Sequence, residues 1–205
     1  MNVTLTVSPT GIDKDLLSSM SRLNNRTQIR KSLFINNVSL DKRFQDLKEK
    51  MIKEFNNHPI TQEILAGPSG SNSSGTLGGY GNLFSFIGFT KGEKPIKPII
   101  DLLMQTTMDI TKMDRRGRMR INITLPSKED IFSVTPLPYA PGISWAKRME
   151  SGLSGLGYFL SKKNVGRSTG GVQVEEKLGQ GRFQNVRYIS DFINRWQKQF
   201  SNIAK

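Results

Sequence analysis

The sequence predicts an α+β fold: an antiparallel sheet packed by a long amphipathic helix and a C-terminal helix, with an extended N-terminal arm. Apolar residues recur at helical spacing over residues 39–55 and again from Val186 onward. Residues 3–7 and 118–126 instead alternate between apolar and polar side chains, which is typical of half-buried strands. We therefore expect an arm over residues 1–38 and a single α+β domain over residues 39–205.

The arm begins with the alternating β-branched strand of residues 3–7, and helical spacing follows over residues 12–23. The long helix starts near Ser39, a plausible N-cap, and ends before Pro59. Residues 60–66 add about two helical turns, because Gly67 and Pro68 then interrupt the chain.

Residues 71–89 carry no charge and change character midway. The first five residues predict a polar turn after a helix, and the rest predicts a strand region fed by that turn. Gly78, Gly79 and Gly81 favour a bend or a close approach of chains over phosphate binding. The apolar residues of the strand region are assigned to the core or to a subunit interface: Leu83, Phe84, Phe86, Ile87 and Phe89.

Residues 99–110 have the composition of a helix or a buried strand. The turn at residues 114–117 and the segment at 89–95 both suit hairpin connections. We expect a short helix at 144–150, a strand at 172–178 and a final helix with an aromatic stripe. That stripe packs on the chain's own sheet or docks on a neighbouring subunit; it comprises Tyr188, Phe192, Trp196 and Phe200.

Composition excludes several kinds of chemistry. The 205 residues include no cysteine, which removes disulfides, zinc–thiolate sites, iron–sulfur clusters and cysteine nucleophiles. The start of the chain has no signal-peptide pattern, and no apolar run approaches the ~18 residues of a membrane span. We therefore expect a soluble protein from a reducing compartment, without membrane contact.

The acidic residues, the histidine and the glycines do not combine into a catalytic motif. His58 is the single histidine and precedes a proline, so a role at a helix end is favoured. The adjacent acids at 129–130 and 175–176 are assigned to solvated faces, since neighbouring strand residues point to opposite sides. The glycine patterns fit neither a dinucleotide loop nor a P-loop. We expect no enzymatic activity, no catalytic residue, no metal and no cofactor.

The charge balance predicts an acidic neighbour. The net charge is +13, and residues 111–205 carry most of it, with 17 Lys and Arg against 7 Asp and Glu. The basic side chains gather in a turn with its following strand and in two later segments. They contact nucleic acid or an acidic subunit, or they form a solvated face; they are Lys112, Arg115, Arg116, Arg118, Arg120, Lys147, Arg148, Lys162, Lys163 and Arg167.

The order of several short motifs resembles a family of viral proteins. Ser74-Gly75-x-Leu77 follows the long helix, Tyr139-Ala140 leads to Trp145, and Glu150-x-Gly152 precedes Phe159-Leu160. This order resembles the neck, or tail-completion, proteins that join head to tail in tailed bacteriophages. In that family the Ser-Gly-x-Leu turn enters a strand.

The resemblance implies a non-enzymatic virion protein at the head–tail junction, made in the host cytoplasm. It implies a homo-oligomeric ring, commonly of six or twelve copies, between a portal-side adaptor and the tail, around the channel through which DNA leaves. The basic residues would then face DNA or acidic subunits. The alternative is a basic nucleic-acid-binding module that uses the Lys and Arg of segments 112–120 and 147–167.

Overall fold

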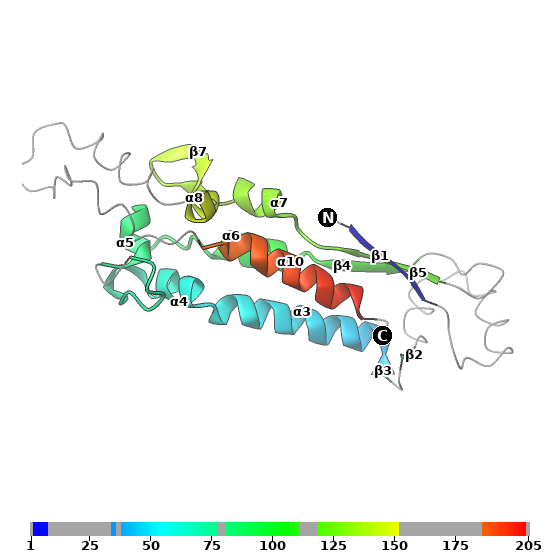
Figure 1. The fold of residues 1–205 in the computed structure, drawn as a ribbon. Helices are drawn as coiled ribbons and strands as arrows, with labels where there is room; N and C mark the ends of the chain where they lie inside the picture. Colours follow the sequence, from blue (N-terminus) through cyan, green and yellow to red (C-terminus); the bar gives the residue numbers. More distant parts are fainter. Residues whose placement is uncertain are drawn as a thin grey trace, which may run out of the picture. The chain divides into compact units, whose positions relative to one another are not determined.

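The computed structural model describes six stretches of the chain: residues 2–7, 34–35, 38–77, 81–110, 119–151 and 186–203 (Figure 1). The expected helix at 12–23, the turn at 114–117 and the strand at 172–178 lie outside them. The chain forms two compact units. The first comprises Met1–Lys53, Leu102–Ser127 and Asn194–Lys205, and the second comprises Glu54–Asp101 and Lys128–Ile193.

The first unit contains a three-stranded antiparallel sheet in the order β1-β5-β4. Its strands are β1 (Asn2–Val7), β4 (Thr107–Ile110) and β5 (Met119–Thr124). The central strand β5 pairs Thr4 with Asn122 on one side and Met108 with Ile123 on the other. Side chains alternate between the two faces of β5, because Ile121 and Ile123 are buried while Arg120 is exposed. The predicted antiparallel sheet is confirmed, and β4 and β5 pair antiparallel within it.

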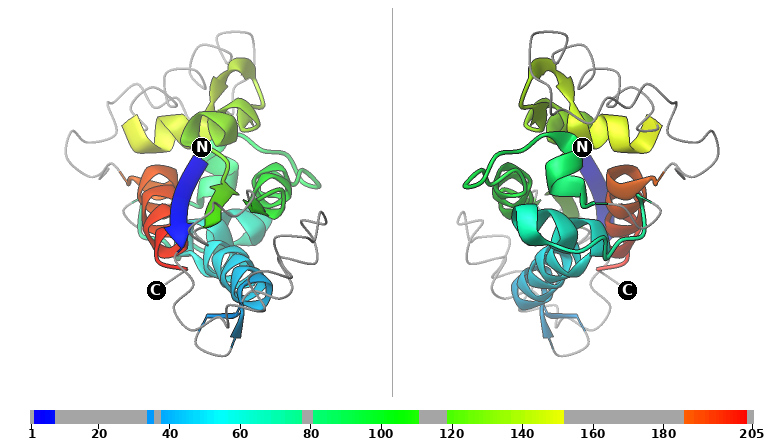
Figure 2. Two further views of the ribbon diagram at one scale, coloured as in Figure 1. Left: turned by 90° about the vertical axis from the view of Figure 1, so that its right-hand side faces the viewer. Right: turned by 90° about the vertical axis from the view of Figure 1, so that its left-hand side faces the viewer.

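Helices α3 (Leu40–Asn57) and α10 (Tyr188–Ser201) also contribute to the first unit (Figure 2). Phe44 on α3 lies 5.8 Å from Phe200 on α10, between ring centroids. The Arg43 guanidinium donates to the Ile203 carbonyl, and Lys48 Nζ donates to the Thr106 carbonyl just before β4. A short ladder of β2 (Phe34–Ile35) and β3 (Val38–Ser39) precedes α3. The two amphipathic helices predicted from the sequence are thus confirmed.

The second unit is mainly helical. Its elements are α4 (Pro59–Leu65), the 3₁₀ turn η1 (Gly67–Ser69), α5 (Leu83–Ile87), α6 (Lys97–Met104, which ends in the first unit), α7 (Lys128–Ser133) and α8 (Trp145–Ser151). A small hairpin of β6 (Pro136–Leu137) and β7 (Ala140–Ser144) lies between α7 and α8. The helix expected at 144–150 is confirmed as α8, and residues 97–110 form a helix followed by a strand.

The prediction of a strand region at residues 76–89 is wrong, because residues 83–87 form helix α5. The Asn82 side chain caps this helix by accepting from the Ser85 amide, 2.9 Å away. Gly88 ends it with a left-handed φ of 93°. Leu83, Phe84 and Ile87 lie on one face and are buried. The two capping residues and the one-sided apolar face therefore favour a helix here, although Phe and Ile have a high β-propensity.

Two smaller predictions are corrected with it. Residues 89–95 connect the helices α5 and α6, so they are not a hairpin turn. Glu129 and Asp130 are exposed, as expected, but they lie in the first turn of α7, where acids favour the helix dipole. Residues 175–176 lie outside the described part of the chain.

The N-terminal strand belongs to the sheet and does not project from it. Asn2 to Val7 pair along their whole length with Thr124 to Met119 of the same chain. The first unit joins Met1–Lys53 to two later segments, so it does not end at residue 38, where the sequence analysis placed the end of the arm. The α+β class, the sheet and both long helices agree with the sequence-based prediction.

Candidate functional site

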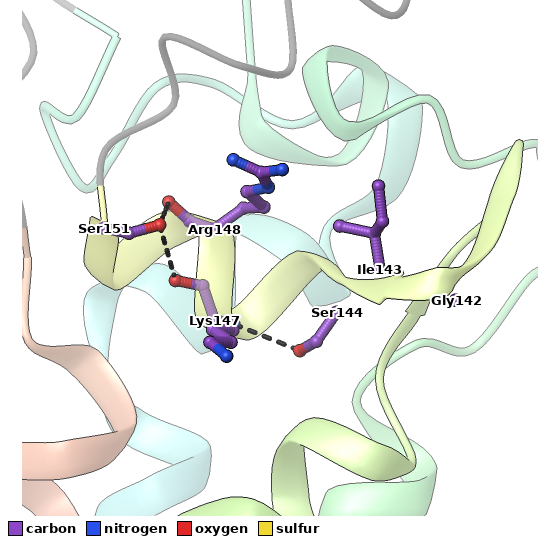
Figure 3. Close-up of a pocket in the computed structure, with 6 residues that line it drawn as sticks. All are labelled: Gly142, Ile143, Ser144, Lys147, Arg148 and Ser151. Atoms are coloured by element: carbon purple, nitrogen blue, oxygen red, sulfur yellow. Dashed lines mark hydrogen bonds between the residues drawn. The ribbon is translucent and has the colours of Figure 1, made fainter.

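The candidate site is an open pocket of about 380 Å³ in the second unit, between β7 and α8. Strand β7 contributes Gly142, Ile143 and Ser144, while α8 contributes the remaining three lining residues, Lys147, Arg148 and Ser151 (Figure 3). No carboxylate or imidazole is among its lining residues, and the two cations Lys147 and Arg148 can attract an anion.

Local hydrogen bonds fix the strand-to-helix junction that shapes this pocket. The Ser144 hydroxyl accepts from the Lys147 amide at 3.1 Å and shares a hydrogen bond with the Thr135 hydroxyl at 2.8 Å. The Trp145 amide donates to the Thr135 carbonyl at 2.8 Å. Because Trp145 is buried and its ring packs edge-on against Phe89, α8 is anchored to the core beneath the pocket.

The two cations of the pocket leave α8 in different directions (Figure 3). Lys147 is exposed and Arg148 is half-buried. Arg148 also acts on Tyr139: burial raises the pKa of the tyrosine hydroxyl, and the nearby guanidinium partly opposes that rise. Tyr139 therefore remains neutral at physiological pH.

The structure brings together only part of the predicted basic set. Lys147 and Arg148 line one pocket, while Arg120 is exposed on β5 in the other unit. Lys112, Arg115, Arg116, Arg118, Lys162, Lys163 and Arg167 lie outside the described residues.

Sequence reasoning missed a buried carboxylate, Glu63 on α4, which is 1% exposed. Its Oε2 accepts from the Ser74 amide at 2.9 Å, and its Oε1 accepts from the Leu83 amide at 2.7 Å. One side chain thus binds both the middle of the segment between α4 and α5 and the first residue of α5. The sequence contained a sign that Glu63 is buried, because Glu63 falls on the same helical face as the apolar Ile60 and Ile64.

Asn82 makes further hydrogen bonds to the segment between α4 and α5. Its Nδ2 donates to the Pro68 carbonyl at 3.0 Å and to the Gly70 carbonyl at 2.9 Å, while its Oδ1 caps α5. Asn82 is buried, so these bonds satisfy groups that water does not reach. The uncharged stretch that follows α4 is therefore fixed by two polar side chains from its borders.

A second carboxylate holds the start of α10. The Glu150 side chain accepts from the Ser190 amide at 2.6 Å and from its hydroxyl at 2.5 Å. Free amides at a helix N-terminus favour a negative charge, so Glu150 stabilises this end of α10. Glu150 belongs to the motif order that resembles the neck proteins, whereas Gly152, Phe159 and Leu160 lie outside the described residues.

The aromatic stripe of α10 is buried within the chain. Tyr188, Phe192, Trp196 and Phe200 are each at most 2% exposed. The Tyr188 hydroxyl and the Thr61 hydroxyl lie 2.5 Å apart, and burial raises the pKa of Tyr188 well above its ordinary value while that hydrogen bond opposes the rise. The stripe is core in this structure. Leu83, Phe84 and Ile87 are core as well, while Phe86 and Phe89 are half-buried.

His58 takes a structural position in the described chain. Its Nδ1 accepts from the Ile60 amide at 3.2 Å, which makes it the N-cap of α4, and its ring lies 4.8 Å from that of Tyr188. The helix-boundary role is confirmed, although His58 caps the following helix and not the preceding one. Among the described residues, no group of three metal-ligating side chains converges.

None of the helices in the described stretches is long and apolar enough to cross a membrane. Comparison of the chain with protein-family models, with curated proteins and with solved structures finds no match.

Proposed function

We propose that this chain is a structural subunit of the head–tail connector of a tailed bacteriophage, without enzymatic activity. In this proposal, copies of the chain form a ring, commonly of six or twelve, between a portal-side adaptor and the tail. The ring surrounds the DNA exit channel, and the protein is made in the host cytoplasm before it joins the virion.

The observation that carries the proposal is the role of the motif residues that resemble the neck family. Ser74, Trp145 and Glu150 all lie in the second unit, and each takes part in a contact that joins two segments of the chain. The Ser74 amide donates to Glu63, Trp145 packs on Phe89, and Glu150 accepts from Ser190 at the start of α10. Contacts of this kind stabilise the fold of the second unit, and a subunit of an assembly requires a stable fold. The element after the Ser74-Gly75-x-Leu77 turn is helix α5, where the resemblance implies a strand.

The sheet supplies a second support. Strands β1 and β4 stand at its two edges, and in the described residues each pairs with β5 alone. The outer edge of such a strand has backbone groups that can pair with another chain. A heterologous contact of this kind between identical subunits generates a ring when its rotation closes.

Association with neighbouring virion proteins tests the proposal. The purified chain, mixed with the portal-side adaptor and the tail protein of the same phage, is expected to migrate with at least one of them on a density gradient. A chain that sediments alone at every ratio of the three proteins contradicts the proposal. Bovine serum albumin in place of the partners controls for nonspecific association.

A second candidate function is nucleic-acid binding through the pocket at α8. Lys147 and Arg148 line a pocket with no acidic residue, and the whole chain carries a net charge of +13. Phosphate contacts by such side chains release counterions, which makes binding weaken as salt rises.

The double variant Lys147→Gln/Arg148→Gln is expected to bind duplex DNA more weakly at low salt. Its plot of log affinity against log salt concentration should flatten by about two, since each phosphate contact contributes about 0.9 to the slope. The matched control is Lys91→Gln/Lys94→Gln, which removes the same charge at exposed positions of the same unit. Fluorescence anisotropy measures both; equal slopes for the two variants would rule out a specific role for the pocket.

A further inference from the structure

Strand β1 is connected to the rest of the described chain mainly through one neighbour. It pairs with β5 over all six of its residues, from Asn2 opposite Thr124 to Val7 opposite Met119. Among the described elements, β5 is the only one with which β1 makes extensive contact. It also occupies an edge of the sheet, so its removal exposes one side of β5 and leaves the β4–β5 pairing in place.

A long stretch of sequence separates β1 from the next described element. Residues 8–33 lie between Val7 and β2. At ~3.3 Å per residue, a segment of this length reaches up to roughly 85 Å. That reach exceeds the diameter of roughly 43 Å expected for a compact sphere of 205 residues, whose radius of gyration is roughly 17 Å. The covalent connection therefore permits β1 to pair with the β5 of a neighbouring copy.

We propose that β1 is exchanged between subunits, so that the β1 of one copy completes the sheet of the next. This inference rests on the proposed function, which supplies the neighbouring copy. The exchanged pairing repeats the same contacts and register as the pairing within one chain, so it requires no new complementary surface. Within a ring, the neighbour's β5 is held at high effective concentration, which favours exchange over dissociation.

The absence of cysteine makes this pairing directly testable by cross-linking. Thr4 and Asn122 face each other across β1 and β5, and Thr4 is exposed. Facing residues of antiparallel strands have Cα atoms ~4.5–5.5 Å apart, within the range of a disulfide. A cysteine at each position therefore reports which chain supplies β1.

The variants Thr4→Cys and Asn122→Cys are co-expressed as separate chains, oxidised and run on a non-reducing gel. Exchange predicts that a disulfide-linked dimer containing one chain of each kind is the main product. The double variant Thr4→Cys/Asn122→Cys should then give a ladder of covalent multimers. A second pair, Thr6→Cys with Arg120→Cys, repeats the test two residues further along the same strand register.

The control pair Thr4→Cys with Lys50→Cys measures random collision, because Lys50 is exposed on α3 and is not among the residues that pair with β1. Light scattering on the same samples separates the two proposals. Assembled particles whose double variant forms only intrachain disulfides overturn strand exchange and leave the ring intact. Unassembled chains without intermolecular disulfides overturn both, while cross-linked dimers without larger particles retain exchange and contradict the ring.

Discussion

Replacement of Phe55 by alanine is expected to lower the free energy of unfolding by about 3–5 kcal/mol. Phe55 is fully buried near the end of α3. Its ring centroid lies 5.7 Å from that of Tyr188 and 5.2 Å from that of Phe192, so the substitution removes contacts with two aromatic residues of α10. Urea denaturation followed by circular dichroism measures the change.

The matched control for this substitution is Leu65→Ala on α4, in the same unit. The Leu65 side chain is 51% exposed, so truncation should change the free energy of unfolding by no more than about 0.5 kcal/mol. If Phe55→Ala were as mild as Leu65→Ala, the packing of α3 on α10 described above would be wrong.

Glu63→Gln is expected to destabilise the chain by about 2 kcal/mol, the cost of leaving one buried amide unsatisfied, although it changes neither side-chain length nor shape. The carboxylate accepts the Ser74 and Leu83 amides with two different oxygens. Glutamine has one acceptor oxygen, so its NH₂ group must face one of these amides and leave it unsatisfied in a buried site. Urea denaturation measures the loss, and hydrogen exchange should show faster exchange at one of the two amides.

Glu93→Gln is the corresponding control, because it makes the same chemical change at an exposed carboxylate. Glu93 accepts from the amide and the hydroxyl of Thr90, within a solvent-exposed turn. Water can replace those bonds, so we expect less than about 0.5 kcal/mol. Equal effects of the two substitutions would argue against the proposed role of Glu63 in fixing the segment between α4 and α5.

Periodicity was sufficient to predict the elements that bury one long face. The stripe of Leu40, Phe44, Met51 and Phe55 defined α3, and the stripe from Tyr188 to Phe200 defined α10. The alternation along β5 defined its buried and exposed sides. In each case a repeated spacing is a property of the sequence itself, independent of which partner covers the face.

Helix α5 shows where this reasoning fails. Its five residues are too few for a helical period to be distinguished from an apolar strand, and Phe and Ile both favour strands. The deciding signals were the borders, since Asn82 caps the start and Gly88 the end. If the capping residues Asn82 and Gly88 are given more weight than the β-propensity of the residues between them, the sequence predicts a helix.

The functional assignments depended on relations that sequence alone does not specify. Glu63 accepts hydrogen bonds from residues 11 and 20 positions further along the chain, and the contact between Glu150 and Ser190 spans 40 positions. Only the grouping of Lys147 and Arg148 was evident from the sequence, because both lie on one turn of α8. The pocket around them also requires Gly142 and Ile143 of the preceding strand, which the hairpin positions.

The mass of the particle formed by the purified chain tests the proposed ring most directly. Size-exclusion chromatography with multi-angle light scattering gives this mass over a range of concentrations, alone and with the portal-side adaptor. The proposed ring should appear as a closed species whose mass is six or twelve times the 23.0 kDa subunit, with no larger species as concentration rises. A mass of one subunit at every concentration, with the adaptor present, would contradict it.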